Sequence, residues 1–135
     1  EPYLHGLEAS RRARGVEVFA ALRSLGREGV ARMIEAGCRH AERLAEGLRA
    51  AGHEVLNEVV LNQVVVGFGD AEANAAVIRR VQRAGVCWCG PTHWRQRHAM
   101  RISVSGWATS EDDIERSLES ILACAADGLE RGDAA

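Results

Sequence analysis

The feature that most constrains the fold is a change of hydrophobic pattern at Gly52. Before it, apolar residues recur at three- and four-residue steps, which is the period of an amphipathic helix. These residues are Val30, Met33, Ile34, Cys38, Ala41, Leu44, Ala45 and Leu48. After Gly52, apolar and β-branched residues come in short runs, which is typical of strands. The part after Gly52 is expected to form a small sheet with two helices on one face, which is the layering of the α+β class.

End signals give bounds for the helices. We expect four of them, over residues 7–25, 27–51, 71–84 and from 111 onward. Gly26 and Gly85 follow the first and third helices, and glycine is common just after a helix. Ser110, with Asp113 three positions later, is related to a capping box and predicts the start of the last helix.

The strands are short. We predict them over residues 54–56, 62–68, 86–89 and 100–105. The run 62–68 is too apolar for a strand with one wet face, so we expect it to be central in its sheet. A loop is expected over 90–97, where glycine and proline interrupt the pattern. This order predicts two N-terminal helices followed by a small, mostly antiparallel sheet with helices packed on one face.

The length of 135 residues suits a single domain, 1–135. Within it we expect a helical entry segment over 7–51 and an α/β sheet unit over 52–127. The chain begins with Glu1 rather than methionine. We therefore expect it to be an excised or truncated piece of a longer protein.

Charge and cysteine content restrict the partners and the compartment. The net charge of −2 gives no reason to expect a nucleic acid or an anionic membrane as a partner. Apolar runs stay below the roughly 18 residues of a membrane span, so we expect no membrane partner. Four cysteines at this length do not suggest a disulfide framework. We therefore expect a reducing, cytoplasmic location.

Arg101 is the most informative single residue. All 17 basic residues of the chain are arginine, so chemistry that needs a lysine amine requires another polypeptide segment. In the run 100–105, alternation places Met100 and Ile102 on one face and Arg101 and Ser103 on the other. The arginine fork suits a carboxylate, which predicts a carboxylate clamp. The alternative is an arginine that pairs with a local glutamate on the surface.

The segment before Arg101 offers two more candidates. Trp94 lies between polar neighbours and is expected at the edge of a pocket or interface. Cys87 and Cys89, followed by His93 and His98, raise the alternative of a zinc site. Their spacing differs from that of the usual Cys-x2-Cys knuckle, so we favour buried thiols.

Four blocks of the sequence, taken in order, resemble one family. They are residues 10–29, 59–64, 87–90 and 100–107, and the match runs from about Tyr3 to Leu122. The blocks resemble the C-terminal part of the group II pyridoxal-phosphate-dependent amino-acid decarboxylases. This family of lyases includes glutamate, aromatic-amino-acid and 2,4-diaminobutyrate decarboxylases.

The resemblance implies the small C-terminal domain of a fold-type I carboxy-lyase, in which a large domain of the same chain holds pyridoxal 5'-phosphate (PLP) on a lysine. It implies that Arg101 meets the carboxylate of an amino-acid substrate, with Trp94 and Ser103 as further substrate-binding candidates. No catalytic, cofactor-binding or metal-binding residue is expected in this chain. Because the Schiff-base lysine is absent, we expect the chain alone to be inactive. A homodimer is expected. The alternative is a stand-alone small-ligand-binding or assembly module without catalysis.

Overall fold

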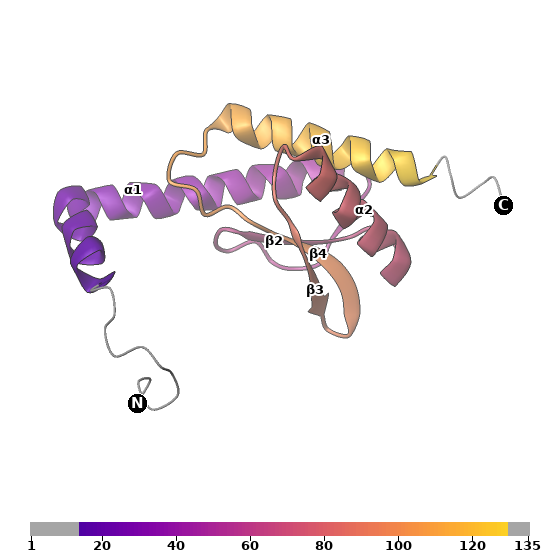
Figure 1. Cartoon of the computed structure of the whole chain (residues 1–135), viewed down its shortest axis with the longest axis horizontal. Helices are drawn as coiled ribbons and strands as arrows, with labels where there is room; N and C mark the ends of the chain where they lie inside the picture. Colours follow the sequence, from indigo (N-terminus) through magenta and orange to yellow (C-terminus); the bar gives the residue numbers. More distant parts are fainter. Residues whose placement is uncertain (1–13, 130–135) are drawn as a thin grey trace. The chain divides into compact units, whose positions relative to one another are not determined.

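The structure of the protein, a computed structural model, describes residues 14–129 (Figure 1). Its elements in chain order are α1 (Arg14–Ala50), β1 (Glu54–Val55), β2 (Gln63–Gly67), α2 (Ala71–Ala84), β3 (Gly90–Trp94), β4 (Arg97–Ser103) and α3 (Glu111–Leu129). The chain divides into two compact units, Glu1–Arg32 and Met33–Ala135. Within the described residues, no helix is both long and apolar enough to cross a membrane.

In the first unit, helix α1 contains a break at Gly26. This residue has φ 63° and ψ −179°, which are not helical values, and the helix continues after it. A positive φ is readily adopted only by glycine, which explains the residue at this position. The two predicted helices therefore meet at Gly26 as expected. The predicted start of the first helix, over 7–13, lies outside the described residues.

The part of α1 before Gly26 exposes large apolar side chains. They are 43% to 67% exposed and comprise Val16, Val18, Phe19, Leu22 and Leu25. Several exposed apolar side chains close together in one helix segment are typical of an interaction site.

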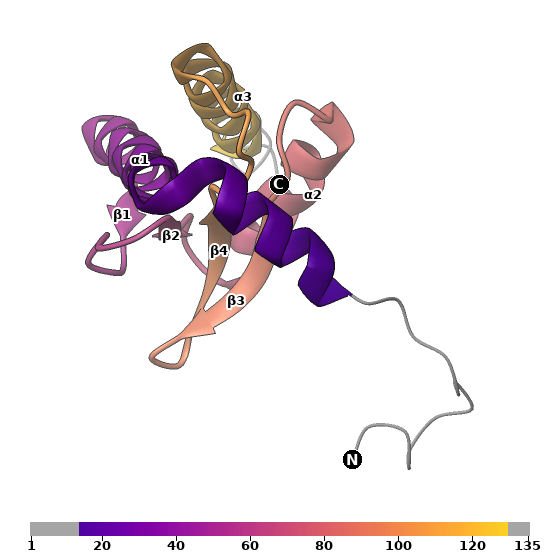
Figure 2. The same ribbon diagram turned by 90° about the vertical axis from the view of Figure 1, so that its left-hand side faces the viewer.

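The second unit contains a four-stranded sheet with the order β1-β2-β4-β3. Every pairing in it is antiparallel. Strand β2 lies between β1 and β4, so the predicted central position of this apolar run is confirmed. In Figure 2, the labelled α2 and α3 lie on one side of the strands. The predicted α+β fold is confirmed.

The core lies between the helices and one face of the sheet. The helices contribute Ala41, Leu44, Ala45, Leu48, Val77, Ile78, Val81, Ile114, Leu118, Ile121, Cys124 and Ala125, and the sheet contributes Val64, Val66, Met100 and Ile102. At Gly47 of α1, an added Cβ would overlap the Cδ2 atom of Leu118 on α3. The missing side chain therefore allows these two helices to approach closely.

Local hydrogen bonds explain where α2 and α3 begin. Asp70 caps α2 because its Oδ1 accepts a hydrogen bond from the Ala73 amide at 2.8 Å. At α3, the Ser110 amide donates to Asp113 Oδ2 at 3.0 Å, and the Asp113 amide donates to Ser110 Oγ at 3.2 Å. These reciprocal bonds form the predicted capping box. Gly85 ends α2 with φ 70°, as its position predicted.

The predicted loop over 90–97 is wrong. These residues form β3, a two-residue turn and the start of β4. Pro91 is tolerated because β3 is an edge strand, where a missing amide hydrogen costs no ladder bond on the outer side. The turn residues Arg95 and Gln96 have φ 46° and 68°. Such turns usually contain asparagine and glycine, and this signal is absent from the sequence.

The predicted strand over 86–89 is also wrong. The structure contains no strand there, and the Cys89 carbonyl accepts a hydrogen bond from Gln82 Nε2 of α2 at 2.8 Å. This bond ties the segment to the preceding helix rather than to the sheet. Cys87 and Cys89 are therefore not placed on a common strand face. Trp88 between them is 74% exposed, so it does not belong to the core.

Candidate functional site

The candidate site lies on the sheet face opposite the core. Register places Arg101 of β4 beside Val65 of β2 and Gly90 of β3, and Ser103 beside Gln63. Directly paired residues of an antiparallel ladder share a face. The predicted alternation holds, because Arg101 and Ser103 are exposed whereas Met100 and Ile102 are 0% and 5% exposed.

Arg101 is the only arginine on the sheet strands without a hydrogen bond or an ion pair among residues 14–129. Within residues 14–129, its guanidinium forms no ion pair or hydrogen bond. Arg97, by contrast, makes two hydrogen bonds to Glu54, at 2.8 and 2.6 Å, and Arg43 makes two to Glu115. The alternative of Arg101 pairing with a local glutamate is therefore not observed among the described residues.

Trp94 lies on the same face as Arg101 but at the other end of β3. It pairs with Arg97, whereas Gly90 pairs with Arg101. Four residues of strand separate these positions, a distance of about 13 Å. The guanidinium carbon of Arg95 is 6.0 Å from the Trp94 ring centroid, within range of a cation–π interaction. The structure therefore brings Ser103 near Arg101, and places Trp94 at the hairpin turn.

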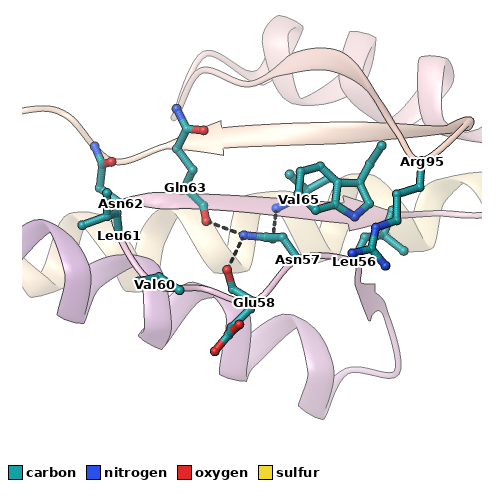
Figure 3. Close-up of a pocket in the computed structure, with 10 residues that line it drawn as sticks. Leu56, Asn57, Glu58, Val60, Leu61, Asn62, Gln63, Val65 and Arg95 are labelled. Atoms are coloured by element: carbon teal, nitrogen blue, oxygen red, sulfur yellow. Dashed lines mark hydrogen bonds between the residues drawn. The ribbon is translucent and has the colours of Figure 1, made fainter.

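A pocket of about 800 Å³ opens beside this face (Figure 3). It is lined by Leu56, Asn57, Glu58, Val60, Leu61, Asn62, Gln63, Val65, Trp94 and Arg95. Val65 and Gln63 connect it to the Arg101 face, because they pair with Arg101 and Ser103. The pocket therefore lies next to the predicted carboxylate site and includes the predicted Trp94.

Asn57 connects three other pocket-lining residues by hydrogen bonds to their backbone atoms. It was not among the site residues predicted from the sequence. Its side-chain amide donates to the carbonyls of Glu58 and Gln63, at 3.1 and 3.0 Å, and its Oδ1 accepts from the Val65 amide at 2.7 Å (Figure 3). An asparagine directly after a short strand is a frequent turn former. That signal was present in the sequence, although it does not indicate a pocket.

Arg97 and Glu54 form a second feature of the open face. The Arg97 side chain extends past Gly67, where an added Cβ would lie 3.8 Å from its Nη2 atom. The pKa of Glu54 is lowered, chiefly because Arg97 donates hydrogen bonds to the carboxylate, and the pKa of Arg97 is raised by the same bonds. Both groups are exposed, so solvent screens the pair.

This pair predicts a pH effect on stability. A carboxyl group whose pKa is lower in the folded than in the unfolded chain stabilises the fold at any pH above its unfolded pKa, which is ordinarily 4.5 for glutamate. This stabilisation is lost as the pH falls through the pKa of the folded state. We therefore expect the melting temperature of the chain to exceed that of Glu54→Gln at neutral pH, and the difference to shrink below about pH 4.5. Glu58→Gln, at an exposed residue without an ion pair among residues 14–129, is the control. If the melting-temperature difference between the parent chain and Glu54→Gln stays constant down to about pH 3, the stabilising role assigned to the Glu54–Arg97 pair is wrong.

Cys87, Cys89, His93 and His98 are not grouped as a metal site in the structure. Burial raises the pKa of the Cys89 thiol to about 12, and burial also raises that of Cys87. His93 and His98 instead pair across the exposed hairpin, with ring centroids 4.1 Å apart and ring planes tilted by 59°. Among residues 14–129, no three His, Cys, Asp or Glu side chains are grouped so that they could hold a metal ion. The zinc alternative therefore receives no support from the structure.

Comparison with known proteins relates the chain to decarboxylases. No family model matches it. The histidine decarboxylase of Drosophila melanogaster is 32% identical over 124 residues, which are 90% of this chain and 14% of that protein. The chain therefore spans about one seventh of the length of this curated relative.

Solved structures share the fold. TDC from Oryza sativa, solved with PLP and tryptamine, matches with a TM-score of 0.78 and 18% identity, over 90% of this chain and 28% of that chain. The glutamate decarboxylase domain of diaminobutyrate-pyruvate transaminase and L-2,4-diaminobutyrate decarboxylase from Vibrio parahaemolyticus matches with a TM-score of 0.71 and 21% identity, over 90% and 28% of the two chains. The resemblance predicted from four sequence blocks is confirmed: over 90% of its length this chain is similar to part of a histidine decarboxylase, and it shares the fold of the corresponding part of pyridoxal-phosphate-dependent amino-acid decarboxylases.

Proposed function

We propose that this chain is the small C-terminal domain of a PLP-dependent amino-acid decarboxylase, and that it closes the active site and supplies Arg101 to the substrate carboxylate. The observation that carries the proposal is the Arg101 guanidinium, which is exposed and has no partner within residues 14–129. A charged fork on a ligand-accessible face is suited to bidentate binding of a carboxylate. The relatives of the chain are decarboxylases, and their substrates carry that group.

In this proposal Arg101 orients the substrate. PLP, when bound, supplies the electron sink for breaking the bond to the carboxylate carbon. The chain contains no lysine, so the covalent attachment of the cofactor belongs to a larger domain. Arg101 fixes the carboxylate through two parallel hydrogen bonds and thereby limits rotation of the substrate. Closure of the site removes water from this pair and strengthens it.

The same proposal assigns partners to two surfaces. The open sheet face meets the larger domain, which brings the cofactor to Arg101. The exposed apolar side chains of α1 before Gly26, among them Val16 and Phe19, meet a large domain or the second subunit of a homodimer. Their burial would stabilise such an assembly by roughly 25 cal/mol for each Å² of apolar surface removed from water.

The proposal is tested by comparing the chain with the full-length enzyme that contains it. We expect the PLP-loaded enzyme to release carbon dioxide from one of L-histidine, L-tryptophan, L-glutamate or L-2,4-diaminobutyrate, and the chain alone to release none. The isolated chain is also titrated with the four amino acids by calorimetry. Cofactor-free binding by the chain, together with an inactive full-length protein, would support the alternative of a ligand-binding module.

A further inference from the structure

Gly90, the first residue of β3, is paired directly with Arg101. The backbone does not require glycine there, because the positive-φ glycines of residues 14–129 are Gly26, Gly52, Gly69 and Gly85. Packing does not require it either: a Cβ added to Gly90 would meet no heavy atom within 4 Å, including those of Arg101. Neither local conformation nor the core accounts for a glycine at this position.

A glycine in a strand has a cost. It loses more backbone entropy on folding than other residues and adds no cross-strand contact. Glycine in a strand can mark a bulge, a bend, or a site at which a ligand or another backbone approaches closely. The open space lies on the β3 side of Arg101, whereas Val65, only 5% exposed, occupies the β2 side. The guanidinium is therefore open to a ligand from one flank.

We infer that Gly90 determines which ligands Arg101 accepts, by leaving space for the carboxylate and the groups attached to its carbon. This inference rests on the proposed function, because it takes the ligand of Arg101 to be an amino acid. A side chain at position 90 would share the face with Arg101 and would occupy the volume that the ligand needs. Gly90 would then act as a specificity-determining residue and not as part of the reaction.

The test is a graded series at position 90 in the full-length, PLP-loaded enzyme, with Gly90→Ala and Gly90→Val. We expect Gly90→Val to raise KM for the amino acid roughly tenfold or more, with a smaller change in kcat, and Gly90→Ala to have an intermediate effect. The melting temperature should not fall, because valine favours strands and the site has room for it. A lowered melting temperature in Gly90→Val would overturn the claim of free space.

Thr92→Leu provides the matched control, because Thr92 lies on the same face of β3, two residues further from Arg101. We expect it to leave KM within about twofold of the parent enzyme. Equal losses in Gly90→Val and Thr92→Leu would overturn the inference, since they would indicate a general docking effect of this face.

Arg101→Ala separates this inference from the proposed function. If Arg101→Ala weakens activity while Gly90→Val leaves KM unchanged, the inference is wrong and the proposed function stands. If Arg101→Ala leaves kcat/KM unchanged, the proposed role of Arg101 is wrong, and the inference fails with it.

Discussion

Replacement of Arg101 by alanine should lower kcat/KM of the full-length enzyme by roughly 2 to 4 kcal/mol in transition-state stabilisation, about 30-fold to 1,000-fold. The reason is that the substrate carboxylate, buried on closure, would lose its charged hydrogen-bond donor. Arg97, which lies on the same face, is not free to replace it, because its guanidinium is already bonded to Glu54. The measurement is steady-state kinetics of carbon dioxide release by the PLP-loaded enzyme.

Two variants control this prediction. Arg101→Lys keeps the charge but not the planar fork, so its kcat/KM should lie between those of the parent and Arg101→Ala. Arg116→Ala removes a largely exposed arginine on α3, 3.9 Å from Asp113, and should change kcat/KM by less than about twofold. Unchanged kinetics in Arg101→Ala would contradict the proposed contact with the carboxylate.

Replacement of Leu48 by alanine should lower the free energy of unfolding by about 3 kcal/mol, within a range of roughly 2 to 5. Leu48 is 0% exposed and belongs to the core between α1 and the sheet. Truncation removes buried apolar contacts and leaves a cavity that the neighbours fill only in part. Urea denaturation of the chain, followed by circular dichroism, measures the change.

Ile34→Ala is the matched control on the same helix. The sequence places Ile34 and Leu48 in one apolar periodic pattern, yet Ile34 is 51% exposed in the structure. Its truncation should change the free energy of unfolding of the chain by about 0.5 kcal/mol or less. Equal losses in Ile34→Ala and Leu48→Ala would show that the core extends further along α1 than the structure indicates.

Local signals determined the helices well. The caps of α2, Asp70 and Gly85, and the reciprocal pair Ser110 and Asp113 act within one or two helical turns. Such interactions depend on neighbours in the sequence, so the helix ends could be predicted from residue types alone. The apolar run of β2 likewise predicted a central strand: β2 lies between β1 and β4, and even Val65, on the face opposite the core, is only 5% exposed.

The β3–β4 hairpin could not be predicted in the same way. Its turn residues Arg95 and Gln96 adopt positive φ values without the usual asparagine or glycine, and Pro91 argues against a strand. Both features are acceptable only because β4 supplies a pairing partner on one side and β3 lies at the edge. The information therefore resides in long-range pairing, which local propensity does not contain.

The sequence by itself determined which side of β4 carries Arg101, because side chains alternate along any strand. Only the tertiary structure decided what surrounds it: the register sets Gly90 and Val65 beside Arg101, and brings Glu54 to Arg97 instead. The register depends on how the apolar face of each strand meets the helices above it. Periodicity thus identified the candidate arginine, whereas its missing partner and the open space beside it followed from packing across the whole sheet.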